Sequence, residues 1–167
     1  HTRYGTVTGV QTCALPILLF VSHCPSENTR RLRESVLEGI DSLSLDTLEM
    51  RSLDPLSAVA EDVEWCDGIL LGTTENFGYM AGLVKDFFER IYYPCIESRQ
   101  GLPFALYIRA GQDGRGTQDS IARIISGLRW RYISDPLILR GEYCEAFEHS
   151  VAELGMTLAA GVDAGLF

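Results

Sequence analysis

The sequence is first informative through what it lacks. No apolar run approaches the roughly 20 residues that a helix needs to cross a bilayer. Basic residues are scarce, because 14 Lys and Arg stand against 23 Asp and Glu for a formal net charge of −9. The five cysteines show neither C-x-x-C pairing nor zinc-ligand spacing. We therefore expect no nucleic acid, no anionic membrane and no metal as a partner, and we expect the reducing cytoplasm as the compartment.

The first 17 residues do not have the pattern of a folded segment. Residues 7–17, VTGVQTCALPI, match the reading-frame translation of a widely used short-read sequencing adapter, and residues 1–3 fit the flow-cell end of the same oligonucleotide. We expect residues 1–17 to derive from that adapter and residues 18–167 to form one domain. A chain of this length suits a single hydrophobic core.

Apolar runs alternate with helical stripes along the rest of the chain. The predicted strands cover residues 18–21, 47–51, 68–71, 104–108 and 132–139. The first, third and fourth are continuous apolar runs, typical of strands covered on both faces. The second alternates, and Asp135 with Pro136 interrupts the fifth, which places both at edges. Five βα units of this kind predict a three-layer α/β fold, with a five-stranded parallel sheet in the order 2-1-3-4-5 and helices on both faces.

Three loops rich in Ser, Thr, Asn and Gly each follow a predicted strand and lead into a predicted helix. They are residues 22–29 (SHCPSENT), 72–82 (GTTENFGYMAG) and 109–117 (RAGQDGRGT). The carboxyl ends of parallel strands share one edge of a sheet, where helix N-termini hold anions. We therefore expect the three loops to form one ligand site.

These loops resemble those of the flavodoxin-like fold family, of the NAD(P)H-dependent FMN reductase and quinone reductase type. SHCPSENT is similar to the phosphate loop of that group. Residues 72–90, GTTENFGYMAGLVKDFFER, are similar to its G-T/S-P-x-x-F/Y-G-x-M-x-G segment and the helix beneath the flavin, with Thr74 in place of the frequent proline. The resemblance covers essentially residues 18–167. It implies FMN as the cofactor, NAD(P)H as a transient hydride donor, a small-molecule electron acceptor, and a homodimer or higher homo-oligomer.

The resemblance also assigns roles to the loop residues. The candidate contacts are, for the phosphate, Ser22, His23, Ser26, Asn28 and Thr29; for the cover and edge of the isoalloxazine ring, Thr73, Thr74, Glu75, Asn76, Phe77, Gly78 and Tyr79; and for its pyrimidine side, Arg109, Ala110, Gly111 and Gln112. No catalytic side chain is expected, because hydride transfer at a flavin needs no acid or base. The alternatives are that Asn28 or Thr29 only caps a helix, and that Phe77 and Tyr79 only pack.

A phosphatase is the alternative from a different enzyme class. His23, Cys24 and Arg30 form H-C-x-x-x-x-x-R, in which a thiolate attacks phosphorus and an arginine holds its oxygens. Low-molecular-weight tyrosine phosphatases also use a late Asp-Pro acid, to which Asp135 would correspond. Against this, Pro25 directly follows the cysteine, and the second loop is left without a role.

A one-electron flavodoxin-type carrier is the third possibility. Its acidity would suit docking to basic partners. The M-x-G-x-x-K-D-F segment favours the reductase, since carriers usually have a shorter loop there. Separately, Phe87, Phe88, Tyr92 and Tyr93 are more aromatic surface than one helix face can bury, so we expect either a dimer interface or a core helix followed by a packed turn.

Overall fold

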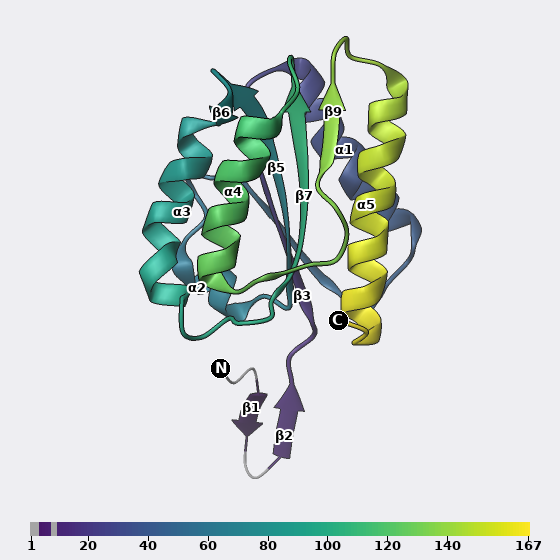
Figure 1. Ribbon diagram of the computed structural model, residues 1–167. Helices are drawn as coiled ribbons and strands as arrows, with labels where there is room; N and C mark the ends of the chain where they lie inside the picture. The colour runs from purple at the N-terminus through teal and green to yellow at the C-terminus, as the bar shows by residue number, and fades with distance from the viewer. Residues whose placement is uncertain (1–3, 8–9) are drawn as a thin grey trace.

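The computed structural model describes residues 4–7 and 10–167, in which helices cover both faces of a mostly parallel sheet (Figure 1). The strands are β1 (Tyr4–Val7), β2 (Val10–Cys13), β3 (Ile17–Ser22), β4 (Glu49–Leu53), β5 (Gly68–Asn76), β6 (Tyr79–Met80), β7 (Pro103–Ala110), β8 (Arg131–Tyr132) and β9 (Leu137–Arg140). The helices are α1 (Glu27–Ser42), α2 (Ala60–Trp65), α3 (Gly82–Cys95), α4 (Arg115–Leu128) and α5 (Glu145–Ala164).

The main sheet confirms the predicted fold class. Its order is β4-β3-β5-β7-β8, and β9 also pairs with β7, so β8 and β9 together occupy the fifth position. The break between them contains Asp135 and Pro136, as the sequence predicts for an edge. Three details differ from the prediction: the sheet has seven strands and not five, the second strand begins two residues later, at Glu49, and β5 continues to Asn76 to form an antiparallel hairpin with β6.

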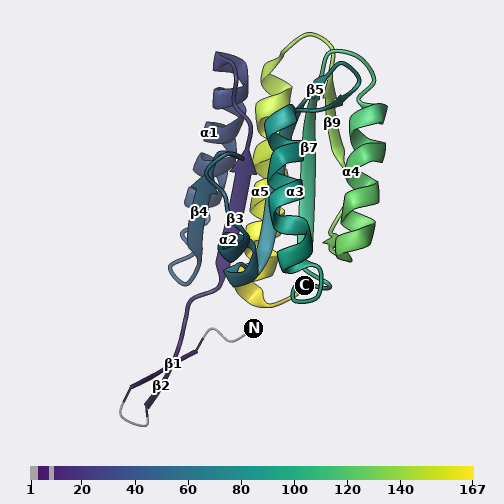
Figure 2. The same cartoon turned by 90° about the vertical axis from the view of Figure 1, so that its left-hand side faces the viewer.

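The sheet separates two hydrophobic cores because successive strand residues point to opposite faces. Leu19, Ile69 and Leu106 belong to the core under α2, α3 and α4, whereas Leu18 and Leu70 belong to the core under α1 and α5. Figure 2 shows α3 in front of the strands and α5 behind them, so helices cover both faces of the sheet. This packing holds the carboxyl ends of the central strands at one edge, the upper edge in Figure 1.

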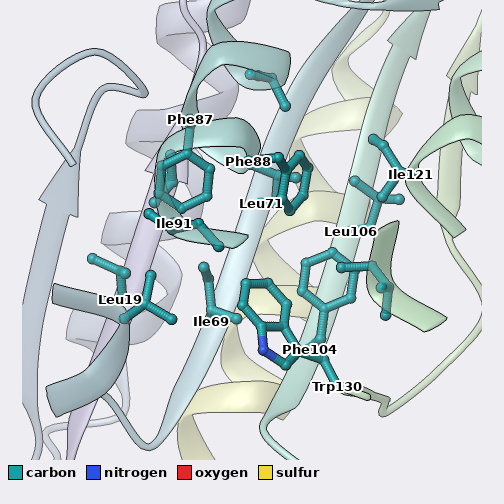
Figure 3. Packing of buried hydrophobic residues seen from close by; sticks show 14 of the residues in the cluster. Leu19, Ile69, Leu71, Phe87, Phe88, Ile91, Phe104, Leu106, Ile121 and Trp130 are labelled. Atoms are coloured by element: carbon teal, nitrogen blue, oxygen red, sulfur yellow. The ribbon is translucent and has the colours of Figure 1, made fainter. Parts of the chain in front are cut away.

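The aromatic residues of α3 settle one alternative. Phe87 and Phe88 are buried between α3 and the sheet, and the Phe88 ring lies 6.3 Å from that of Trp130 (Figure 3). Tyr92 is half-buried and Tyr93 is exposed, with its ring 5.2 Å from that of Tyr92. The predicted interface across all four aromatic side chains is therefore wrong for two of them, because the sheet already covers their rings.

The amino-terminal segment lies outside the main sheet. β1 and β2 pair with each other and extend beyond the lower end of the sheet in Figure 1. Within residues 1–17, for which the sequence predicts an adapter origin, residues 1–3 and 8–9 lie outside the described residues. Ile17 is buried in β3, and its N–H donates to a carboxylate oxygen of Asp67 at 2.8 Å. The first strand of the domain thus includes residue 17.

No helix within residues 4–7 and 10–167 is both long enough and apolar enough to cross a membrane.

Candidate functional site

The three predicted loops meet at the carboxyl edge of the sheet. They follow β3, β5 and β7, which are consecutive neighbours in the sheet. The N–H of His23 donates to the carbonyl oxygen of Gly72 at 3.0 Å, which joins the first loop to the second strand end. The parallel arrangement therefore brings the loops to one place, as the sequence predicts.

The first loop ends in a capped helix. Ser26 is the N-cap of α1, its hydroxyl accepts the Thr29 N–H at 3.2 Å, and the Thr29 hydroxyl accepts the Ser26 N–H at 3.0 Å. The expected cap at Asn28 or Thr29 is corrected to Ser26, because this reciprocal pair is a capping box. The cap takes only the third N–H of the helix, so the amides of Glu27 and Asn28 remain for an anion, although the Glu27 carboxylate itself opposes one.

The residues at the end of β3, beneath this loop, are wholly or partly buried. Ser22 is buried, and the Cys24 thiol donates weakly to the Ser22 hydroxyl at 3.6 Å and to the Thr29 carbonyl oxygen at 3.5 Å. Burial lowers the pKa of His23, while the charge of Asp54 opposes that shift. The imidazole is thus favoured in its neutral form, and Asp54, in the turn after β4, is a neighbour of the site that the sequence analysis did not identify.

The second loop is mostly β-structure. Asn76 pairs with Tyr79, so Phe77 and Gly78 form a two-residue turn, and both have left-handed backbones with φ of 54° and 72°. Such a conformation is typical of type I′ hairpin turns but is unfavourable for phenylalanine. The Phe77 side chain is fully exposed, with a relative accessibility of 107%. A large aromatic ring is therefore held at the rim of the site with nothing packed on it.

Some polar residues of the hairpin stabilise its fold, and others lie at the rim of the site. Thr73 is buried, donates to the Thr74 carbonyl oxygen at 3.0 Å and accepts the Ala81 N–H at 3.3 Å, so its hydroxyl supports the hairpin. Thr74 donates to the Asn76 side-chain oxygen at 2.9 Å, and Tyr79 is partly exposed. Of the residues predicted to line the ring edge, Thr73 is thus held under the hairpin.

Glu75 joins the second loop to the third. Its two carboxylate oxygens accept the N–H groups of Gln112, at 2.9 Å, and of Gly114, at 2.8 Å. Gly114 is the N-cap of α4. The carboxylate therefore lies at the positive end of that helix, where an external anion would otherwise bind.

The hairpin also touches the first turn of α4. A Cβ added at Gly116 would overlap the carbonyl oxygen of Gly78. The sequence places Gly116 in the third loop without a role of its own, whereas the structure places it in the first turn of α4.

The third loop supplies backbone more than side chains. Arg109 points toward the α5 face of the sheet, where its guanidinium donates to the carbonyl oxygens of Ala110 and Leu139, and it lies 5.1 Å from the Phe147 ring centroid. Its charge is therefore not presented to the cavity beside the hairpin. Ala110 is buried, while Gly111 and Gln112 are exposed at the rim.

These features surround a cavity. It has a volume of about 430 Å³ and is lined by Glu75, Phe77, Gly78, Gly111 and Gln112. All five are among the residues predicted from the sequence. A cavity of about 520 Å³ lies elsewhere, between α1 and β4, and none of the three loops contributes to it. The cavity wall combines the open backbone of two glycines with a fully exposed aromatic residue, a combination that suits a planar heteroaromatic ligand.

The residues of the phosphatase alternative are only partly brought together. Cys24 and Arg30 flank the first turn of α1, but Asp135 lies in the break between β8 and β9, in the fifth sheet position. β5 and β7 separate that position from β3, a distance of roughly 14 Å at 4.8 Å per strand. The expected acid is therefore not near the thiol.

The sheet order and the helices on both faces define an α/β protein of the flavodoxin-like fold class, with three loops gathered at the carboxyl edge. No protein-family model matches the chain. A curated flavodoxin from Aquifex aeolicus (strain VF5) is 34% identical over 101 residues, which are 60% of this chain and 54% of that protein. The chain thus spans about half the length of this relative.

Solved structures support the same fold. A flavodoxin from the domain Archaea superposes with a TM-score of 0.72 and 18% identity, over 87% of this chain and 98% of that chain. The WrbA-like flavodoxin protein from Agrobacterium tumefaciens gives 0.69 and 14%, over 90% of this chain and 98% of that chain. At these identities the likeness establishes the fold.

Proposed function

We propose that this chain is an FMN-dependent oxidoreductase that passes electrons from NAD(P)H to a quinone, a flavin or a similar small acceptor. The observation that carries the proposal is Phe77, a fully exposed ring on a left-handed turn above the cavity. A folded chain tolerates an unfavourable backbone and an unpacked aromatic at a site where a ligand uses them. When bound, FMN would supply the electron-transfer chemistry. Overall, NAD(P)H loses a hydride, and a quinone gains two electrons and two protons, one of them from solvent.

The residues of this chain would bind and orient the cofactor. The capped end of α1, with Ser26, Asn28 and Thr29, would receive the phosphate. Phe77 and Tyr79 would cover the ring, and the backbone of Gly111 and Gln112 would approach its pyrimidine side. We also propose a homo-oligomer that uses the exposed Tyr93 on α3, and a cytoplasmic location.

A one-electron carrier is the second candidate, and two observations favour it. The chain is 34% identical over 101 residues to a protein named flavodoxin, and its net charge of −9 suits docking to basic partners. A stable one-electron-reduced form would distinguish the carrier from the reductase.

The test is a visible spectrum of the full chain, recorded without oxygen before and after addition of NADPH or NADH. Flavin bands that bleach within minutes and return on addition of a quinone would support the reductase. Bound flavin that bleaches only with dithionite would support the carrier. A colourless protein that takes up no added FMN would refute both, and phosphate-ester hydrolysis dependent on Cys24 would be assayed next.

Paired variants test the role of the hairpin tip. Phe77→Ala should weaken FMN binding about tenfold, because base–aromatic stacking contributes roughly 1–3 kcal/mol per ring. Leu166→Ala is the control, since Leu166 is a similarly exposed large apolar residue after α5, outside the cavity and outside the proposed oligomer interface. Equal dissociation constants for the two variants would contradict the proposed stacking role.

A further inference from the structure

Glu75 is the one charged residue among the five that line the cavity. Both of its oxygens accept backbone N–H groups, one from each of two residues of the third loop. The side chain thus places a fixed negative charge on the wall of the cavity.

The same two hydrogen bonds cross between separate segments. Glu75 lies at the end of β5, whereas Gln112 and Gly114 precede α4, 37 and 39 residues further along the chain. The hairpin that carries Glu75 packs against the first turn of α4 at Gly116. The carboxylate therefore closes a ring of contacts between the two loops on either side of the cavity.

We propose that Glu75 is a positioning residue that holds the loop before α4 against the hairpin, and that its charge makes the site bind oxidised flavin in preference to reduced flavin. This inference rests on the proposed function. Reduction adds electron density to the ring, and a nearby carboxylate disfavours that density. The Gln112 N–H, which belongs to a residue that lines the cavity, already donates to this carboxylate.

Glu75→Gln tests both parts of the proposal. The amide keeps the size of the side chain, loses the charge, and offers one acceptor oxygen where the carboxylate offered two. Hydrogen exchange in the flavin-free protein should accelerate at the Gln112 and Gly114 amides by about tenfold or more. The ratio of reduced to oxidised FMN affinity should rise about tenfold, which is about 30 mV for a two-electron couple.

Glu89→Gln is the matched control. It removes the same charge from α3, where Glu89 is exposed and pairs with Lys85 at 3.3 Å, away from the cavity. It should change neither the exchange of the two amides nor the affinity ratio. If the ratio rises equally in both variants, net charge and not the placement of Glu75 is responsible, and the charge part of the proposal is wrong.

The remaining outcomes separate this inference from the proposed function. Unchanged exchange at Gln112 and Gly114 in Glu75→Gln would overturn the positioning role even if the protein binds FMN normally. Faster exchange with an unchanged affinity ratio would overturn the charge effect alone. If the wild-type chain takes up no FMN, the proposed function and the charge effect both fail, whereas the exchange rates still decide the positioning role.

Discussion

The contact between Gly116 and the hairpin predicts that a substitution at residue 116 weakens FMN binding without lowering the free energy of unfolding. A Cβ at residue 116 would overlap the carbonyl oxygen of Gly78, so the turn at Phe77 and Gly78 must withdraw by roughly 1.5 Å to restore van der Waals separation. A misplacement of about 1 Å in a binding constellation costs up to roughly a hundredfold. We expect Gly116→Ala to weaken FMN binding by ten- to a hundredfold.

Stability should not follow the loss of binding. Gly116 is exposed in the first turn of α4, and alanine favours a helix over glycine by about 1 kcal/mol in a helix interior. The exposed turn has room to move, so the free energy of unfolding should stay within about 1 kcal/mol of wild type. Urea denaturation and fluorescence titration with FMN measure the two quantities on one preparation.

Gly82→Ala is the control for this experiment. Gly82 begins α3 in the same way that Gly116 lies near the start of α4, but a Cβ there meets nothing within 4 Å. It should bind FMN as wild type does. The reasoning would be refuted if Gly116→Ala bound FMN with wild-type affinity, because the hairpin would then not need its present distance from α4.

Three further outcomes follow from the same geometry. Phe77→Gly should raise the free energy of unfolding by about 1 kcal/mol in urea, through relief of the left-handed backbone, yet weaken FMN binding. His23 has a folded-state pKa below its ordinary 6.5, so the unfolded chain binds more protons than the folded chain. The free energy of unfolding should therefore fall as the pH drops from about 6.5 toward the folded-state pKa. Denaturation curves recorded at several pH values should lose this dependence in His23→Gln. Phe88→Ala should cost roughly 4 kcal/mol of unfolding free energy, since the ring is buried against Trp130; a loss below 1 kcal/mol would contradict the described core.

The layered fold was predictable because its signals are local. Continuous apolar runs at residues 68–71 and 104–108 identify strands covered on both faces, and the break at Asp135 and Pro136 identifies an edge. Parallel strands joined by helices then have their carboxyl ends at one edge, so the meeting of the three loops follows from the pattern alone.

The strand boundaries were less predictable. Residues 72–76 are polar and have the composition of a loop, yet they continue β5 because β7 lies beside it and β6 folds back on it. Thr73 and Thr74 suit a strand, but the glycine before them and the Glu-Asn pair after them do not favour one. The β5–β6 hairpin, and with it the position of Phe77, therefore depends on strand pairings that the local sequence does not predict.

The sequence by itself determined the class of fold, the edge that carries the site, and most of the residues at its rim. Only the tertiary structure decided what each side chain does there. Arg109 turns to the α5 face because strand residues alternate between faces, and Glu75 finds its two amides 37 and 39 residues away. The physical reason is that the partners of a side chain depend on which strands become neighbours and on which face of the sheet the residue points to. Neither can be read directly from the order of residues in the chain.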